Sequence, residues 1–294
     1  MRTDATLLPD HDLDSAYRTV DGVRFHVVTA GDESAPLVVL LHGFPEFWYG
    51  WRHQIEPLVD AGCRVLVPDQ RGYNLSAKPD RLREYRVARL ARDVVALIHS
   101  EGRESAHVVG HDWGAAVAWE LALRCPNAVD RLGICNVPHP LVFRRHLRSN
   151  PAQLRKSWYV FYFQLPWLPE VGARRNDFEK LVGALDRADP DAMTDRDLER
   201  YRAAWRVPGA LSAMIDWYRA AVRYRETPPR RIVEAPTLIV WGERDFALEP
   251  EMAPESLAYC AEGRLERFPD VGHWVLHDRP EAVADLLADH LAGG

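Results

Sequence analysis

The stretch VVGHDWGAAVAWELALR (residues 108–124) combines the end of an apolar strand, a tight turn and the start of a helix. Gly110 and Gly114 flank Asp112 at G-x-x-x-G spacing. Small residues permit a sharp backbone turn that leaves the central side chain clear of its neighbours. The stretch therefore predicts a nucleophile elbow, a strand–turn–helix unit that exposes Asp112 at the carboxyl end of a sheet. The competing interpretation is that Asp112 is a helix N-cap.

Similar short apolar runs occur on both sides of this stretch, and each ends in Gly, Asp or Asn. They are PLVVLLHG (36–43), CRVLVPD (63–69), AHVVGHD (106–112), RLGICN (131–136) and APTLIVWG (235–242). Continuous apolar runs are typical of parallel strands that are covered on both faces. Residues 84–102 show helical periodicity and end at a glycine, whereas residues 22–31 alternate like a half-exposed strand. We expect an α/β fold with a mostly parallel sheet flanked by helices.

The alternation of strands and helices stops after Asn136 and resumes at Pro236. The stretch between them is rich in Arg, Trp and Tyr, and prolines stiffen both of its ends. We therefore expect one core made of residues 1–138 and 231–294, with residues 139–230 inserted as a helical cap.

Composition limits the function classes that fit this chain. Its 294 residues are 47% hydrophobic, and 37 Lys and Arg against 43 Asp and Glu give a net charge of −6. Such a charge does not favour nucleic acid or a membrane surface as partner. The four cysteines show no CxxC spacing, and the first residues contain no apolar leader, so we expect free thiols and a cytoplasmic protein. Monomer and homodimer both stay open.

Two residues downstream of the elbow complete a set that suits hydrolysis. Asp245 and His273 each lie in a loop just past an expected strand, and the chain order nucleophile, acid, histidine is the one used by folds with this elbow. A loop aspartate alone is usually solvated, and this chain has 12 histidines, so the argument rests on the pair. No phosphate-binding loop, HExxH motif or His/Cys cluster is present. We expect no cofactor and no metal.

An aspartate nucleophile suits a saturated carbon better than a carbonyl, because attack on a carbonyl would produce a mixed anhydride. Attack on carbon gives an alkyl ester on Asp112, which water activated by His273 can cleave while Asp245 orients the imidazole. Cleavage creates an oxyanion on Asp112 itself. By the geometry of this elbow, the backbone N–H groups of Phe44 and Trp113 would face that oxyanion.

Taken together, the segments HGFPEFWYGWR, DQRGYNLSAKP, GHDWGA, GERDF and GHW resemble the α/β-hydrolase superfamily, and specifically its epoxide hydrolases. The resemblance implies an α/β-hydrolase fold, a triad of Asp112, His273 and Asp245, and a helical cap. It also implies two cap tyrosines that donate to the epoxide oxygen. The segments SWYVFYFQLP and IDWYRA match the corresponding motifs and point to Tyr159 and Tyr218, with Tyr162 as the second choice for the first donor.

The expected partners are water and a lipophilic or aromatic epoxide, because the cap is rich in aromatic residues. Three alternatives stay open. A haloalkane or haloacid dehalogenase would use the same aspartate chemistry, and Trp113 also occurs at that position in such enzymes. The aromatic residues could serve only for packing. The chain could also be a binding protein that keeps the pocket without catalysis.

Overall fold

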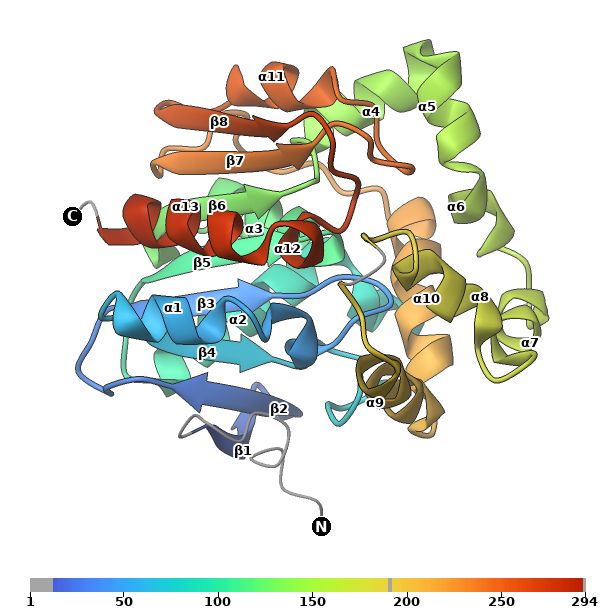
Figure 1. Cartoon of the computed structure of the whole chain (residues 1–294), viewed down its shortest axis with the longest axis horizontal. Coiled ribbons are helices and arrows are strands. Elements are labelled where there is room, and N and C mark those ends of the chain that lie inside the picture. The colour runs from blue at the N-terminus through green and yellow to red at the C-terminus, as the bar shows by residue number, and fades with distance from the viewer. Residues whose placement is uncertain (1–12, 190–191, 293–294) are drawn as a thin grey trace.

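The computed structural model describes residues 13–189 and 192–292. These residues form an eight-stranded sheet in the order β1-β2-β4-β3-β5-β6-β7-β8 (Figure 1). The strands are β1 (Asp14–Val20), β2 (Val23–Ala30), β3 (Leu37–Leu41), β4 (Arg64–Pro68), β5 (Ala106–His111), β6 (Val129–Cys135), β7 (Thr237–Gly242) and β8 (Gly263–Phe268). Pairing is parallel from β4 to β8, and β2 pairs antiparallel with both β1 and β4.

The continuous apolar runs form the centre of this sheet, as the sequence predicts. Every residue of β3, β4 and β7 is buried. The prediction of a half-exposed strand at residues 22–31 is wrong, because β2 is buried from Phe25 to Ala30. Its polar residue His26 tolerates burial because its Nδ1 lies 2.7 Å from Asp69 Oδ2 and its backbone N–H donates to the Ser76 hydroxyl.

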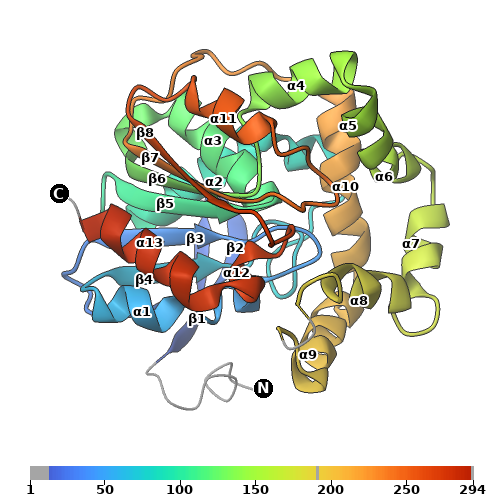
Figure 2. The ribbon, with the colours of Figure 1, turned by 45° about the horizontal axis from the view of Figure 1, so that its top comes forward.

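Helices cover both faces of the sheet (Figures 1 and 2). α1 packs beside α13 on one face, and α2 packs beside α3 on the other. The helix expected within residues 84–102 is α2. The helices outside the β6–β7 connection are α1 (Ile55–Asp60), α2 (Val87–Ser100), α3 (Trp113–Arg124), α11 (Met252–Leu257), α12 (Val275–Asp278) and α13 (Pro280–Ala292). Short 3-10 helices span Trp48–Trp51, Leu82–Tyr85 and Pro126–Ala128.

The chain between β6 and β7 is helical and lies beyond the carboxyl ends of the central strands (Figure 2). We call it the α4–α10 segment. Its helices in the described residues are α4 (Pro140–Ser149), α5 (Pro151–Lys156), α6 (Trp158–Tyr162), α7 (Leu168–Arg174), α8 (Glu179–Leu185), α9 (Asp195–Arg206) and α10 (Ala210–Arg223). Within the described part of the chain, no helix is long and apolar enough to cross a membrane.

Candidate active site

Asp112 lies in the turn between β5 and α3, with φ 50° and ψ −124°. L-residues rarely adopt this backbone conformation, so close packing must hold it. That packing is visible at the neighbouring glycines. A Cβ on Gly114 would overlap the carbonyl oxygen of Leu41, and a Cβ on Gly43 would overlap the Asp112 side chain. Asp112 does occupy the N-cap position of α3, but its carboxylate accepts no capping hydrogen bond from the helix, so side-chain capping does not explain the residue.

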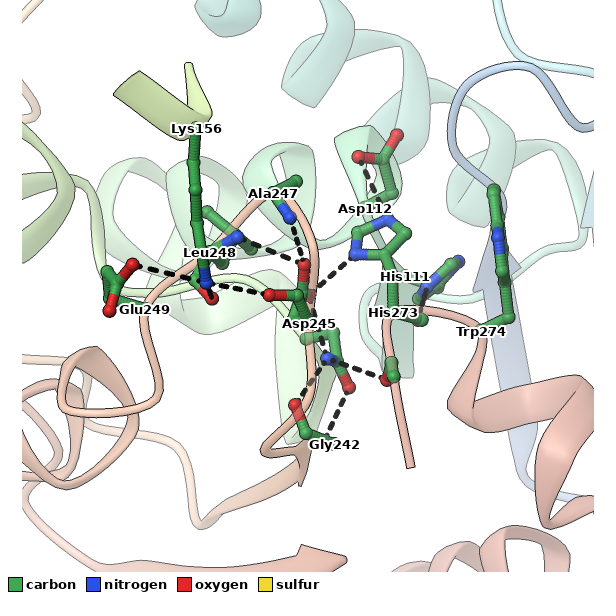
Figure 3. A network of polar contacts seen from close by, with 12 residues as sticks. His111, Asp112, Lys156, Gly242, Asp245, Ala247, Leu248, Glu249, His273 and Trp274 are labelled. Atoms are coloured by element: carbon green, nitrogen blue, oxygen red, sulfur yellow. Dashed lines mark hydrogen bonds and ion pairs between the residues drawn. The ribbon is translucent and has the colours of Figure 1, made fainter. Parts of the chain in front are cut away.

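The structure brings the three residues of the expected triad together. His273 lies between the two carboxylates (Figure 3), with its Nε2 3.6 Å from Asp112 Oδ2 and its Nδ1 2.7 Å from Asp245 Oδ2. His273 and Asp245 are buried at 4% and 2% exposure, so water screens this pair weakly. One imidazole can therefore contact a nucleophile on one side while a second carboxylate orients it from the other.

Backbone and side-chain donors hold the Asp245 carboxylate in place. Its Oδ1 accepts hydrogen bonds from the N–H groups of Ala247 and Leu248 at 2.7 and 3.0 Å. Its Oδ2 accepts one from Asn136 Nδ2 at 2.9 Å, and the Asn136 side-chain oxygen accepts from Gly242 N–H. In the sequence, Asn136 stood out only as the last residue of an expected strand, and nothing there indicated that it supports Asp245. The one local signal was that Asn136 ends a buried strand next to the strand that leads to Asp245.

Lys156 links the α4–α10 segment to the same loop. Its Nζ donates to the carbonyl oxygens of Asp245 and Leu248 at 2.8 and 3.1 Å, and it lies 3.2 Å from Glu249 Oε1 (Figure 3). Since Lys156 closes α5 and α6 follows directly, this contact positions the helix that carries Tyr159 relative to the acid of the triad.

The two carboxylates dominate the electrostatics of His273. Burial lowers the pKa of the imidazole, but Asp245 and Asp112 outweigh burial and raise that pKa to about 10. Burial raises the pKa of the Asp245 carboxyl. His273 and the hydrogen bonds from Asn136 and Ala247 outweigh burial, and the pKa is lowered overall. With its pKa raised to about 10, the His273 ring is an imidazolium at neutral pH in the resting site.

One of the two expected oxyanion donors already contacts the nucleophile. The Phe44 backbone N–H donates to Asp112 Oδ1 at 2.6 Å. Trp113 is the first residue of α3, where backbone N–H groups lack intrahelical acceptors, but the described residues show no hydrogen bond from its N–H to Asp112. Because Oδ1 is held by Phe44, Oδ2 on the His273 side is the freer oxygen of the nucleophile.

Tyr159 on α6 and Tyr218 on α10 lie together in an aromatic cluster near Asp112. Their ring centroids are 5.8 Å apart, and Tyr218 contacts the rings of Phe44 and Trp113 at 5.3 and 5.0 Å. Burial and the charge of Asp112 raise the pKa of both phenols, so both stay protonated. The second-choice donor, Tyr162, is directed elsewhere, since its hydroxyl donates to the Leu168 carbonyl oxygen at 3.3 Å.

A buried acid behind the site was not anticipated from the sequence. Glu46 is 1% exposed, lies 2.8 Å from His277 Nε2 and 3.3 Å from His111 Nδ1, and accepts a hydrogen bond from the Tyr201 hydroxyl at 2.8 Å. The other ring nitrogen of His111 lies 2.9 Å from the His273 carbonyl oxygen. Glu46 thus connects α9 and α12 to the backbone of His273. In the sequence, Glu46 is only an acid directly after HGFP, and this position does not show whether the glutamate is buried or exposed.

The site combines Asp112 in a strand–turn–helix elbow, an imidazole, and a second carboxylate that contacts the imidazole. It lies at the carboxyl end of a mostly parallel sheet, where hydrolases with this elbow place their active sites. Comparison with known proteins agrees with that class. Residues 36–280 match the family model of the alpha/beta hydrolase fold.

Relatives cover nearly the whole chain. The AB hydrolase superfamily protein YfhM of Bacillus subtilis is 44% identical over 92% of this chain and 95% of its own. Epoxide hydrolase 1 of Caenorhabditis elegans is 37% identical over 95% of this chain and 70% of its own. A crystal structure of an epoxide hydrolase from Bacillus megaterium superposes with a TM-score of 0.86 at 30% identity, covering 94% of this chain and 99% of that one. The chain belongs to the epoxide hydrolase family of the α/β-hydrolase superfamily.

Proposed function

We propose that this protein converts an epoxide to a vicinal diol through an ester on Asp112. In the first step Asp112 Oδ2 attacks a ring carbon and the C–O bond to the ring oxygen breaks. One of Tyr159 and Tyr218 transfers its proton to the departing oxygen and becomes a phenolate, while the other donates a hydrogen bond. A ring alkoxide is a poor leaving group until it receives a proton or hydrogen bond, which is the role of the phenols. The α4–α10 segment acts as a cap that supplies both of them.

In the second step His273 accepts a proton from water, and the hydroxide attacks the Asp112 carbonyl carbon. The tetrahedral oxyanion develops on Oδ1, where the Phe44 N–H already points and where the Trp113 N–H would be the second donor. Its collapse breaks the ester bond and releases the diol, and the alkoxide that leaves takes up a proton from the His273 imidazolium. The Asp112 carboxyl then gives its remaining proton to His273, which restores the imidazolium and leaves Asp112 as a carboxylate.

The pKa of His273 supports this order of events. The imidazolium of the resting site cannot accept a proton, but alkylation of Asp112 removes one of the two negative charges that raise its pKa. The pKa of His273 then falls, so the ring gives its proton to the phenolate left by ring opening. The neutral imidazole is then a base at the stage at which hydrolysis requires one. Asp245 continues to orient it through the contact at Nδ1.

The observation that carries the proposal is the pair of protonated phenols beside an aspartate nucleophile. Phenols donate to an oxygen leaving group, whereas a halide needs only N–H donors to cradle it. The dehalogenase alternative therefore explains Trp113, but it does not explain why two buried tyrosines lie close enough to Asp112 for its charge to raise their pKa. A catalytically silent binding protein would have no need for an orienting acid behind His273.

We propose a lipophilic or aromatic epoxide as the substrate class. Phe44, Trp113, Phe163 and Tyr218 contact one another through their rings close to the nucleophile, and such a surface favours apolar ligands. A cytoplasmic location and the oligomeric state stay predictions.

The test is a single turnover of styrene oxide in heavy-oxygen water, with enzyme in excess. The first diol should carry ordinary oxygen from Asp112, because solvent oxygen enters the carboxylate and not the product. Diol already labelled in the first turnover would refute the ester. A parallel assay with 1-bromobutane separates the two substrate classes, and bromide release without diol formation would favour the dehalogenase.

A further inference from the structure

The outer side of the α5–α7 region exposes an unusual number of large apolar side chains. Trp158 and Phe161 are 64% and 59% exposed, and Trp167 and Val171 are 65% and 53% exposed. Leu154 and Leu165 extend the set, which we call the aromatic face: Leu154, Trp158, Phe161, Leu165, Trp167 and Val171. Single exposed apolar residues are ordinary, whereas a contiguous group marks an interaction surface.

The aromatic face is continuous in the chain and in space. Trp158 and Phe161 are three residues apart and so lie on one side of α6, while Leu154 lies on the preceding helix α5 and Leu165 in the bend after α6. The Tyr162 hydroxyl bonds to Leu168 at the start of α7 and would be overlapped by a Cβ on Gly172, so it fastens α6 against α7. In Figure 2 these helices form the edge of the molecule, with α10 between them and the sheet.

The loop that presents Trp167 is held in a strained conformation. Trp167 has φ 51°, a left-handed backbone that bulky residues rarely adopt, and it lies between Pro166 and the Leu168-Pro169 pair that opens α7. A tryptophan that is 65% exposed buries little apolar surface, so its packing does not offset the cost of a left-handed backbone. Strain of this kind concentrates at functional positions.

Charge around the aromatic face differs in sign from the charge of the whole chain. Residues 141–180 contain eight Lys and Arg but only three Asp and Glu, in a protein of net charge −6. Two of those acids are engaged within the protein, Glu170 with Arg219 and Asp177 with Arg206. The exposed cations flanking the face form no ion pair with any described residue: Arg155, Arg174, Arg175 and Lys180.

We propose that the aromatic face docks on an anionic lipid surface. Tryptophan, phenylalanine and leucine bordered by Lys and Arg are the composition of protein surfaces that lie in the lipid interface without spanning the bilayer. Each cation close to an anionic leaflet strengthens binding about fivefold. A second copy of this chain fits less well, because a symmetric contact would bring two positively charged rims together. The net charge of −6, which does not favour a membrane partner, is a sum over the whole chain, whereas the charge next to the aromatic face is positive.

The test is flotation of the full chain with vesicles of phosphatidylcholine, alone or mixed with phosphatidylglycerol, and without epoxide. The protein should float with the mixed vesicles, float poorly with phosphatidylcholine alone, and dissociate as salt screens the charges. Because no substrate takes part, this result is independent of the proposed reaction.

Two double variants should each weaken binding to mixed vesicles by about tenfold or more: Trp158→Ser with Trp167→Ser, and Arg174→Glu with Arg175→Glu. The matched control is Ile232→Ser, which removes an apolar side chain that is 44% exposed just before β7 and should bind like the wild type. Thermal unfolding followed by circular dichroism verifies that each variant is folded.

Two results would overturn the proposal. In the first, the wild type fails to float with the mixed vesicles. In the second, sedimentation velocity shows a dimer that the tryptophan variants dissociate, which would assign the aromatic face to a second copy of the chain.

Discussion

The two halves of the active site are built differently. On the sheet side, Asp112, Asp245 and His273 are positioned by charge contacts and hydrogen bonds from backbone N–H groups. On the helical side, Tyr159 and Tyr218 are positioned mainly by edge-to-face ring contacts. The difference follows from chemistry. A buried carboxylate must be satisfied by donors, whereas a phenol needs a rigid apolar setting and a hydroxyl that can donate to the substrate.

The largest expected effect separates the two steps that we propose for the residues on the sheet side. His273→Gln should still allow alkylation but block hydrolysis, so that turnover falls by about four orders of magnitude. Intact-mass spectrometry after mixing with styrene oxide should show a stable adduct on the protein. Asp112→Ala combined with His273→Gln is the control and should show none. An adduct that persists in the double variant would place the nucleophile elsewhere.

The next effect tests the helical side. Tyr159→Phe together with Tyr218→Phe should slow ring opening by about two to four orders of magnitude, since general acid assistance is lost while the rings stay. Single-turnover formation of the ester on Asp112 measures this step directly. Tyr162→Phe is the matched control on the same helix and should keep nearly the wild-type rate. Wild-type rates in the double variant would remove both tyrosines from the mechanism.

A spectroscopic prediction concerns the charge balance of the sheet side. Asp112→Asn removes one of the carboxylates that raise the pKa of His273 to about 10, so the imidazole should titrate at lower pH in the variant. The sign follows because a neighbouring negative charge favours the protonated ring, and its loss favours the neutral ring. NMR titration of the His273 ring protons measures the shift. An unchanged pKa would mean that Asp112 exerts no influence on the imidazole.

The smallest expected effect concerns Lys156, which connects the helical side of the site to the loop that carries Asp245. Lys156→Met keeps the length of the side chain but removes the donor to the Asp245 and Leu248 carbonyl oxygens. Because Lys156 is partly exposed, we expect a loss of only about 1 kcal/mol in unfolding free energy. Denaturant unfolding gives this value, and kcat with KM shows whether Tyr159 has moved. Arg155→Met, one position earlier and exposed, is the control and should leave both measurements unchanged.

Much of the sheet side was accessible from the sequence because local rules govern it. Glycines around Asp112 predict the tight turn, and continuous apolar runs predict buried parallel strands. The same rules failed at β2, where residues 22–31 alternate but the polar His26 is buried against Asp69 and Ser76. Both partners come from the loop that follows β4, and alternation along one strand carries no information about them.

The helical side was less accessible, because its geometry depends on packing between distant segments. Spacing along residues 158–163 did not separate Tyr159 from Tyr162. The structure does so through Leu168 and Gly172, which hold the Tyr162 hydroxyl away from Asp112. Asn136 and Glu46 were equally hidden, since their partners lie between 65 and 231 residues away in the chain.

By itself, the sequence indicated the chain order of Asp112, Asp245 and His273 and pointed to an aspartate as the expected nucleophile, because both inferences rest on residue type and short-range spacing. Only the tertiary structure decided which hydroxyl approaches Asp112, which amide supports Asp245, and which aromatic side chains remain outside the core. Those outcomes depend on contacts between segments that are far apart in the chain, and no local pattern encodes such contacts.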